Sequence, residues 1–387
     1  MLILSYLHRN IWRNPLRVLM TGLAVGLPIS IFVLSVAVVD GINRFLDNSA
    51  RQLRLAITHK SSIVYPLPAG YRGKIEALDH SRPITVCGMR WIGGKVEDKP
   101  QPLSTLAADP DTFPAAFPEY LTDPAERAAW DRDRQAIVVG RGTAEQFGWR
   151  VGDRITIRAS VPPYSAIPFH VVSTAQDVVD PVTLFCRGDY LEEEVKRQGY
   201  PEGLVSFFFA KCRSPDDLEF YRTAIDAHFA NTPDPTLTQD EKAFMSQFIA
   251  QQFDLPRNLT ILSVLTVVVA IIAAANTMSM NFRDRLAEYA ALKALGFGRT
   301  LVFALIQFES LAICVSAGAL GALGPWYAFT FTALRRFTVP LIQTLDVRLT
   351  VCMQAVGIAA AVGLIAAAWP VWLATRLRPV VAFRALE

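Results

Sequence analysis

Charged residues are scarce in this sequence of 387 residues: they make up 19% of it, while hydrophobic residues make up 52%. Soluble globular domains carry about 25% charged residues, so the composition argues against a chain that is soluble throughout. The apolar surplus is concentrated in four long runs with almost no charge, which are Val18–Val39, Leu259–Met280, Leu301–Trp326 and Val351–Trp372. Because a helix needs about 20 apolar residues to cross a bilayer, these runs predict four transmembrane helices rather than buried helices of a soluble core.

The first run has the basic flank of a secretory signal as well. Arg9, Arg13 and Arg17 precede it, and Ser35-Val36-Ala37 resembles a cleavage site. Its 22 residues, however, exceed the usual apolar region of a signal peptide, which is about 7–15 residues long. We therefore expect a retained membrane anchor.

Histidine and cysteine are also rare, with five of each. The histidines lack the spacing of a zinc site or a catalytic triad, and the three cysteines outside the apolar runs, Cys87, Cys186 and Cys212, allow one disulfide at most. The segment Gly88–Val96 fails as a phosphate-binding loop, because no Ser or Thr follows Lys95. A net charge of +3 is too small to indicate nucleic acid. We expect no enzyme active site and no metal, cofactor or nucleic acid bound by this chain.

Lysine and arginine near the ends of the apolar runs set the expected orientation, since these residues concentrate in cytoplasmic loops. Ten of them fall on the side that carries both termini and the loop between the second and third runs, against three on the other side. The ten are Arg9, Arg13, Arg17, Arg283, Arg285, Lys293, Arg299, Arg376, Arg378 and Arg384, and the three are Arg335, Arg336 and Arg348. We therefore expect both the N and C termini to be cytoplasmic.

The segment between the first two runs is too long for a loop and predicts an extracytoplasmic domain. Its patterns are mixed α/β. Strands are expected at Ala136–Gly140, Arg154–Ala159 and Leu204–Ala210, and helices at Thr143–Phe147, Ser214–Ala230 and Thr236–Leu255. The expected fold class is an integral membrane α-helical protein with four transmembrane helices and a large mixed α/β extracytoplasmic domain between helices 1 and 2.

The expected layout divides the chain into nine parts. They are an amphipathic cytoplasmic segment (1–17, with Leu4, Leu7 and Ile11 on one face), transmembrane helix 1 (18–39), the α/β domain (40–254), transmembrane helix 2 (255–281), a cytoplasmic helix (282–298), transmembrane helix 3 (299–326), a short outer loop (327–350), transmembrane helix 4 (351–372) and a cytoplasmic tail (373–387).

The loop after the second run has the pattern of an amphipathic helix. Its apolar residues recur on one helical face, and Gly296 is a suitable terminator. The face consists of Phe282, Leu286, Tyr289, Ala290, Ala294 and Phe297, and the charged residues Arg283, Asp284, Arg285 and Glu288 lie on other faces. Two interpretations stay open at this point: a helix lying among lipid headgroups, and a helix that docks into a cytoplasmic partner.

The same loop resembles the MacB/FtsX-type permease family of ABC transporters, in which an Asn-x-Met helix end leads into Arg-x-x-Glu-x-x-x-Leu-Lys-Ala-x-Gly. The matching positions are Asn276, Met278, Arg285, Glu288, Leu292, Lys293, Ala294 and Gly296. The sequence departs from the family at Ala287, where a basic residue is common, and at Tyr289-Ala290, where Ile-Gly is usual. Three further stretches resemble the family in the expected order: 137–153, 307–324 and 370–384.

The resemblance implies the type VII ABC exporter fold, of the mechanotransmission class, in the bacterial cytoplasmic (inner) membrane. It implies a dimer with a second permease copy, identical or related, together with membrane lipids and, in some members, a periplasmic adaptor protein. A cytoplasmic ABC ATPase subunit would be a separate chain that carries ATP and Mg, because no Walker A sequence occurs here. The implied ATPase-coupling residues are Arg283, Arg285, Glu288, Leu292, Lys293, Leu295 and Gly296.

Two kinds of residue inside the spans fit this implied mechanism. The intramembrane polar residues are Asn276 and Glu309, and a buried carboxylate is costly unless it is paired, so we expect Glu309 to pair with Arg283 or Arg285 rather than to relay protons. Gly318, Gly321 and Gly324 predict close helix packing, within the subunit or across a dimer, with ordinary membrane glycines as the alternative.

The leading functional interpretation is the permease subunit of an ATP-driven exporter that acts on an amphiphilic or envelope substrate. The alternative is a non-transporting mechanotransmission subunit that controls an envelope enzyme such as a peptidoglycan hydrolase. An autonomous transporter or channel is disfavoured, because four helices with one acidic residue offer too little polar lining.

Overall fold

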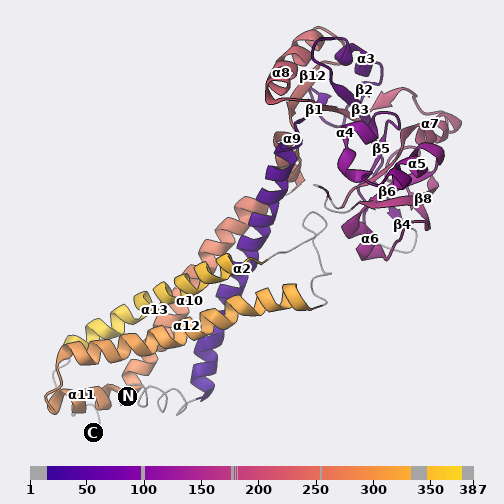
Figure 1. Ribbon diagram of the computed structural model, residues 1–387. Helices are drawn as coiled ribbons and strands as arrows, with labels where there is room; N and C mark the ends of the chain where they lie inside the picture. The colour runs from indigo at the N-terminus through magenta and orange to yellow at the C-terminus, as the bar shows by residue number, and fades with distance from the viewer. Residues whose placement is uncertain are drawn as a thin grey trace. The chain divides into compact units, whose positions relative to one another are not determined.

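The computed structural model describes residues 15–96, 101–175, 178, 180, 182–252, 255–332 and 347–376. Most of the predicted N-terminal amphipathic segment, of the predicted outer loop and of the predicted C-terminal tail lies outside these residues. The chain forms two compact units (Figure 1): a helical unit, which holds the described residues up to Ile42 and those from Leu255 on, and an α/β domain within Asn43–Phe253.

Within the described part of the chain, four helices are long and apolar enough to cross a membrane. They are α2 (Pro15–Ala50), α10 (Leu255–Asp284), α12 (Arg299–Phe331) and α13 (Leu349–Arg376). The α/β domain follows α2 and precedes α10 in the chain. The predicted fold class is therefore confirmed, and the chain is a multi-pass membrane protein.

Small side chains allow the helices of the helical unit to approach closely. A Cβ atom added at Gly321 of α12 would lie 2.4 Å from the carbonyl oxygen of Gly26 in α2, and one added at Gly318 would lie 2.2 Å from the Cβ of Ala359 in α13. The Ser30 hydroxyl donates a hydrogen bond of 2.8 Å to the Gly321 carbonyl. In a bilayer such close contacts replace the hydrophobic driving force that water would provide.

The α/β domain is built on a mixed sheet whose ten strands, counted in the described residues, follow the order β12-β1-β11-β3-β5-β9-β6-β8-β7-β4. The pairs β5–β9 and β6–β8 are parallel, and a separate small sheet pairs β2 with β10. The strands are β1 (Arg54–His59), β2 (Leu67–Pro68), β3 (Thr85–Trp91), β4 (Lys95–Val96), β5 (Thr105–Ala108), β6 (Ala136–Gly140), β7 (Arg154–Arg158), β8 (Ala166–Ala175), β9 (Leu184–Arg187), β10 (Leu204–Val205), β11 (Phe207–Lys211) and β12 (Thr236–Asp240).

Helices and apolar cores cover both faces of this sheet. In β11, Phe207 and Phe209 enter one core with Trp130, whereas Phe208 enters the opposite core with Tyr221. This alternation explains why the strand reads as a continuous apolar run. The covering helices are α3 (Tyr71–Glu76), α4 (Phe113–Ala116), the short 3-10 helix η1 (Pro118–Tyr120), α5 (Pro124–Arg132), α6 (Arg141–Phe147), α7 (Gly188–Arg197), α8 (Pro215–Phe229) and α9 (Glu241–Gln252).

Most of the elements expected in this domain are present as β6, β7, α6 and α8, and the strand expected over 204–210 is divided into β10 and β11. The helix expected over Thr236–Leu255 is wrong in its first turn, because Thr236–Asp240 forms strand β12 beside β1. The hydroxyls of Thr236 and Thr238 both donate to the Asp226 carboxylate, at 2.9 and 2.7 Å, which fixes this edge strand.

The three cysteines of the α/β domain, for which the sequence allowed one disulfide at most, are all free. Cys87, Cys186 and Cys212 are buried separately in the α/β domain, and burial raises the pKa of each thiol to about 12. Thiols with so high a pKa stay protonated and unreactive at neutral pH. These cysteines therefore act as packing residues.

Candidate functional site

The first candidate site is the short helix that follows α10. The sequence predicted one helix over 282–298, but α10 extends to Asp284, Arg285 forms a turn, and the separate helix α11 covers only Leu286–Ala294. The helix ends where Gly296 adopts a positive φ of 90°, and the Phe297 N–H donates to the Leu292 carbonyl at 3.1 Å. This six-to-one bond with glycine in the left-handed region is a Schellman motif, so Gly296 does terminate the helix.

Most of the apolar face predicted for this helix packs inside the same chain. Phe282 and Tyr289 are buried against Val302 and Ile306 of α12 and Ala367 of α13. The Phe282 and Tyr289 rings stack with their centroids 5.8 Å apart. The face that the sequence offered to a partner is thus largely occupied by the protein itself, which attaches α11 to α12 and α13.

The end of α11 and the residues that follow it are exposed, including Ala294 and Phe297 of the predicted apolar face. Leu295 is 77% exposed and Phe297 is 47% exposed, and both follow the exposed residues Ala291 and Ala294. We call these four residues the α11 patch. Exposed apolar side chains that gather at one place mark binding sites more often than scattered ones do.

A buried ion pair holds the turn before α11. The Glu309 carboxylate of α12 is 7% exposed, and it accepts from Arg285 Nη1 at 2.9 Å and from Asn281 Nδ2 at 3.1 Å. Of the two arginines considered from the sequence, Arg285 is the partner, while Arg283 is exposed. The pair connects the end of α10, the start of α11 and α12 at one point.

The other residues predicted from the sequence are spread along α10, α11 and α12. Leu292 is half-buried against the Phe282–Tyr289 cluster, and Glu288 is half-buried too. The backbone of Lys293 belongs to α11, but its side chain lies outside the described part of the structure. Asn276 is exposed on α10, and Gly324 has nothing within 4 Å of an added Cβ atom, unlike Gly318 and Gly321.

The second candidate site is a groove of about 280 Å³ in the α/β domain. Its floor is apolar and includes Leu191, Leu204 and Val205. Polar contacts span the groove: Arg72 pairs with Asp109, Arg90 lies 3.6 Å from Glu192, and the Glu192 carboxylate accepts from the Gly203 N–H at 2.5 Å. Sequence reasoning missed this groove, because its residues come from five separate segments and carry no common motif.

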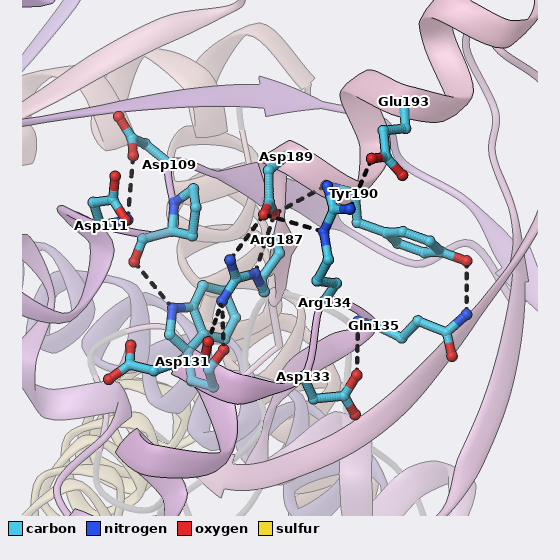
Figure 2. Close-up of polar contacts among 12 residues, drawn as sticks. Asp109, Asp111, Asp131, Asp133, Arg134, Gln135, Arg187, Asp189, Tyr190 and Glu193 are labelled. Atoms are coloured by element: carbon cyan, nitrogen blue, oxygen red, sulfur yellow. Dashed lines mark hydrogen bonds and ion pairs between the residues drawn. The ribbon is translucent and has the colours of Figure 1, made fainter.

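Figure 2 shows how one wall of the groove is fixed. The Arg187 guanidinium donates to both carboxylate oxygens of Asp189, at 3.1 and 2.8 Å, and to the carbonyl oxygen of Trp130 at 2.7 Å. The Trp130 indole N–H in turn donates to the Pro110 carbonyl at 3.1 Å. Since Pro110 and Asp189 both line the groove, this network ties α5, the segment before α4 and the start of α7 into one rigid wall.

In the described residues, no group of three or more histidine, cysteine, aspartate or glutamate side chains is placed to hold a metal ion. Asp189 is engaged by Arg187 and Arg134, Glu193 by Arg134, and Asp109 by the Asp111 N–H. The structure thus attaches α11 to α12 and α13 and leaves a groove with both apolar and charged lining residues in the α/β domain.

Comparisons with known proteins match parts of the chain. Residues 260–379 match the family described as FtsX-like permease C-terminal. A stretch of 127 residues is 28% identical to the macrolide export ATP-binding/permease protein MacB of Syntrophobacter fumaroxidans (strain DSM 10017 / MPOB). The aligned part covers 33% of this chain and only 17% of that relative's length.

Two solved structures are similar to about half of the chain. One is the extracellular domain of the noncanonic ABC-type transporter YknZ from Gram-positive bacteria, at 9% identity and a TM-score of 0.34, covering 48% of this chain and 99% of that one. The other is a domain of a putative permease protein from Porphyromonas gingivalis, at 14% identity and a TM-score of 0.28, covering 49% and 89%.

Proposed function

We propose that this chain, an FtsX/MacB-type permease component, is the membrane subunit of an ATP-driven ABC exporter. A separate ATPase subunit, which carries ATP and Mg²⁺, docks on α11 from the cytoplasm. Its movement passes through α10 to the α/β domain, which extrudes or hands over an amphiphilic or envelope substrate on the other side of the bacterial inner membrane. Both termini are then cytoplasmic, as the arginines near the membrane ends favour.

The observation that carries this proposal is the construction of α11. The helix is attached firmly on one side, through the Phe282–Tyr289 stack and the Arg285–Glu309 pair, and presents the α11 patch on another. A partner that pushes on the patch moves the ends of α10, α12 and α13 together instead of unfolding a loop. A helix lying passively among lipid headgroups would not need the ion pair.

A second permease copy is part of the proposal. The described helices leave one face of α10 exposed, including Val264, Val268 and Ile272, and Asn276 lies exposed on the same helix. An exposed amide in a span is costly in lipid and is stabilised by a hydrogen bond across a helix interface. The proposed dimer is homodimeric or heterodimeric, and a periplasmic adaptor belongs to the same proposed assembly in members that use one.

The experiment that tests the function is capture of the tagged full-length chain from membranes of its own host, followed by an ATP hydrolysis assay of the captured complex. We expect ATPase activity to copurify with the wild type. Leu295→Asp places a charge in the α11 patch and should weaken ATPase binding by about 30-fold, the effect of losing a hot spot of about 2 kcal/mol. Membrane insertion should not change.

The matched control is Val151→Asp, which adds the same charge at a 55% exposed position of the α/β domain and should leave the ATPase bound. Wild-type complexes without ATPase activity would refute the proposal. Equal ATPase recovery from Leu295→Asp and wild type would refute docking on α11. If reconstituted complexes hydrolyse ATP but move no substrate while a murein hydrolase copurifies, the signalling role replaces export.

A further inference from the structure

A fully buried arginine occupies the first position of β1. The side chain of Arg54 is 1% exposed, and its Nε and Nη2 donate to both oxygens of Glu241 at 2.7 and 3.1 Å. Its Nη1 donates to Glu119 at 2.6 Å and to the Ala116 carbonyl at 3.2 Å. The guanidinium also lies 4.1 Å from the centre of the Phe117 ring.

Arg54 and Glu241 stand at the two places where the chain enters and leaves the α/β domain. Arg54 follows the end of α2 at Ala50, and Glu241 is the first residue of α9, after which the chain continues into α10. The neighbouring backbone pairs Leu55 with Asp240. A bidentate arginine–carboxylate contact has a fixed geometry, so it sets the position of α9 relative to β1.

The remaining contacts of Arg54 lead toward the groove. They hold α4 and η1, and the N–H of Phe113 at the start of α4 donates to the carbonyl of Asp109, which lines the groove. The rings of Phe117 and Tyr120 contact Phe185, at centroid distances of 5.9 and 4.7 Å. Strand β9 runs from Phe185 to Arg187, which holds Asp189 in the same wall as Pro110. Continuous side-chain packing therefore joins Arg54 to the groove.

A purely stabilising role would not require this network. A buried ion network has to offset a large desolvation cost, and apolar side chains of similar volume often give equal or greater stability. Burial acts to raise the pKa of Glu241, and the Arg54 charge opposes this effect. The hydrogen bonds of Arg54 fix the orientation of its three partners, Glu241, Glu119 and the Ala116 carbonyl, whereas apolar packing would not.

We infer that Arg54 is a positioning residue that transmits displacement of α9 to α4, η1 and the wall of the groove. The inference rests on the proposed function, since ATP-driven movement of α10 is what would displace α9. The width of the groove then depends on the nucleotide state of the ATPase. The hydrogen bond from Arg54 to Glu119 transmits the displacement to the groove wall.

Hydrogen–deuterium exchange of the full chain in complex with its ATPase tests this inference, with and without ATP plus orthovanadate. Three groups of peptides are compared: α11, the start of α9, and the wall segments 109–120 and 187–192. In the wild type we expect nucleotide to change exchange in all three. In Glu119→Leu, the change in the wall segments should fall by about 3- to 10-fold, within the usual range of coupling effects, while that in α9 persists.

A second variant distinguishes loss of the Arg54 network from misfolding of the α/β domain. Arg54→Met/Glu119→Leu/Glu241→Met replaces the network with apolar side chains and should keep the folded state while losing the same wall response. Arg222→Met/Glu219→Gln removes an exposed pair of α8 and serves as the control. A wall response of wild-type size in the network variants overturns the role of Arg54, and so does a wall response that is absent from the wild type. No nucleotide response in α11 itself overturns the proposed function and the inference with it.

Discussion

The two units of this protein build their interiors from opposite kinds of side chain. One core of the α/β domain is rich in aromatic residues: Phe113 and Phe117 pack against Phe185 at centroid distances of 4.9 and 5.9 Å, and Trp130 packs against Phe113 at 5.0 Å. The core of the helical unit is mainly alanine and valine, and Gly318 and Gly321 make close contacts with neighbouring helices.

The difference follows from the solvent on each side of the fold. In water, burial of large apolar surfaces drives folding, at about 25 cal/mol per Å², so bulky aromatic residues are worth most. Lipid is as apolar as leucine, so a membrane unit gains little from burial and depends on close van der Waals contact and internal hydrogen bonds. Opposite substitutions should therefore be harmful in the two units.

Removing bulk from the α/β domain should have the largest effect. Trp130 is fully buried and its indole N–H holds Pro110, so Trp130→Ala should lower the free energy of unfolding by about 3–5 kcal/mol. Chemical denaturation of the full chain, followed by exchange of the α/β domain peptides, measures the loss. Trp91→Ala, at a 45% exposed position, is the control and should cost less than about 1 kcal/mol. Equal losses at both sites would contradict the aromatic core.

Adding bulk to the helical unit should have the next largest effect. Gly321→Leu would bring side-chain atoms against the Gly26 backbone, which cannot rotate away, and should cost about 1–3 kcal/mol or more. At Gly324, three residues along the same helix, an added Cβ atom meets no atom within 4 Å, so Gly324→Leu should be tolerated. Unfolding in mixed detergent micelles compares the two. If both leucines destabilise equally, close packing against α2 is not the reason for glycine at 321.

The sequence was informative where one local pattern determines the outcome. Hydropathy predicted the four membrane helices, and segment length with local strand and helix patterns predicted the α/β domain between the first two. Residues 260–379 match the FtsX-like permease C-terminal family, in agreement with the resemblance read from the sequence. Because an unpaired carboxylate is costly inside a membrane span, the sequence predicted a basic partner for Glu309, and Arg285 is that partner. Each of these inferences depends on a short segment and on one dominant free-energy term.

Where the outcome depends on distant partners, the sequence was less informative. Periodicity identified the apolar face of α11 but not what covers it, because Val302, Ile306 and Ala367 lie on other helices. Thr236–Asp240 continued a helical pattern, yet pairing with β1 outweighed local preference. Arg54 at the start of a strand gave no sign of burial, since its partners Glu119 and Glu241 are 65 and 187 positions away. The α11 docking residues stay a proposal.

The smallest expected effect is a pH dependence of stability that is present in the α/β domain and absent from the helical unit. Burial acts to raise the pKa of Asp189, but hydrogen bonds and charge from Arg187 outweigh it, so the pKa lies below its ordinary value. A lowered folded-state pKa contributes stability above the unfolded value of about 3.9, and this contribution is lost as the pH falls through the folded value. Asp189→Asn should therefore destabilise the α/β domain by up to about 1 kcal/mol at pH 7, given the partial exposure of the pair, and by nothing once Asp189 is protonated in the wild type.

Thermal unfolding of the α/β domain within the full chain, measured from pH 7 down to pH 2, follows this difference. Asp216→Asn, an exposed aspartate of α8, provides the matched control, since the same change there should shift the unfolding temperature little at any pH. The unfolding of the helical unit should not respond to Asp189→Asn. A destabilisation by Asp189→Asn that persists undiminished at pH 2 would mean that Asp189 acts through packing or neutral hydrogen bonds, and that its charge does not hold the groove wall.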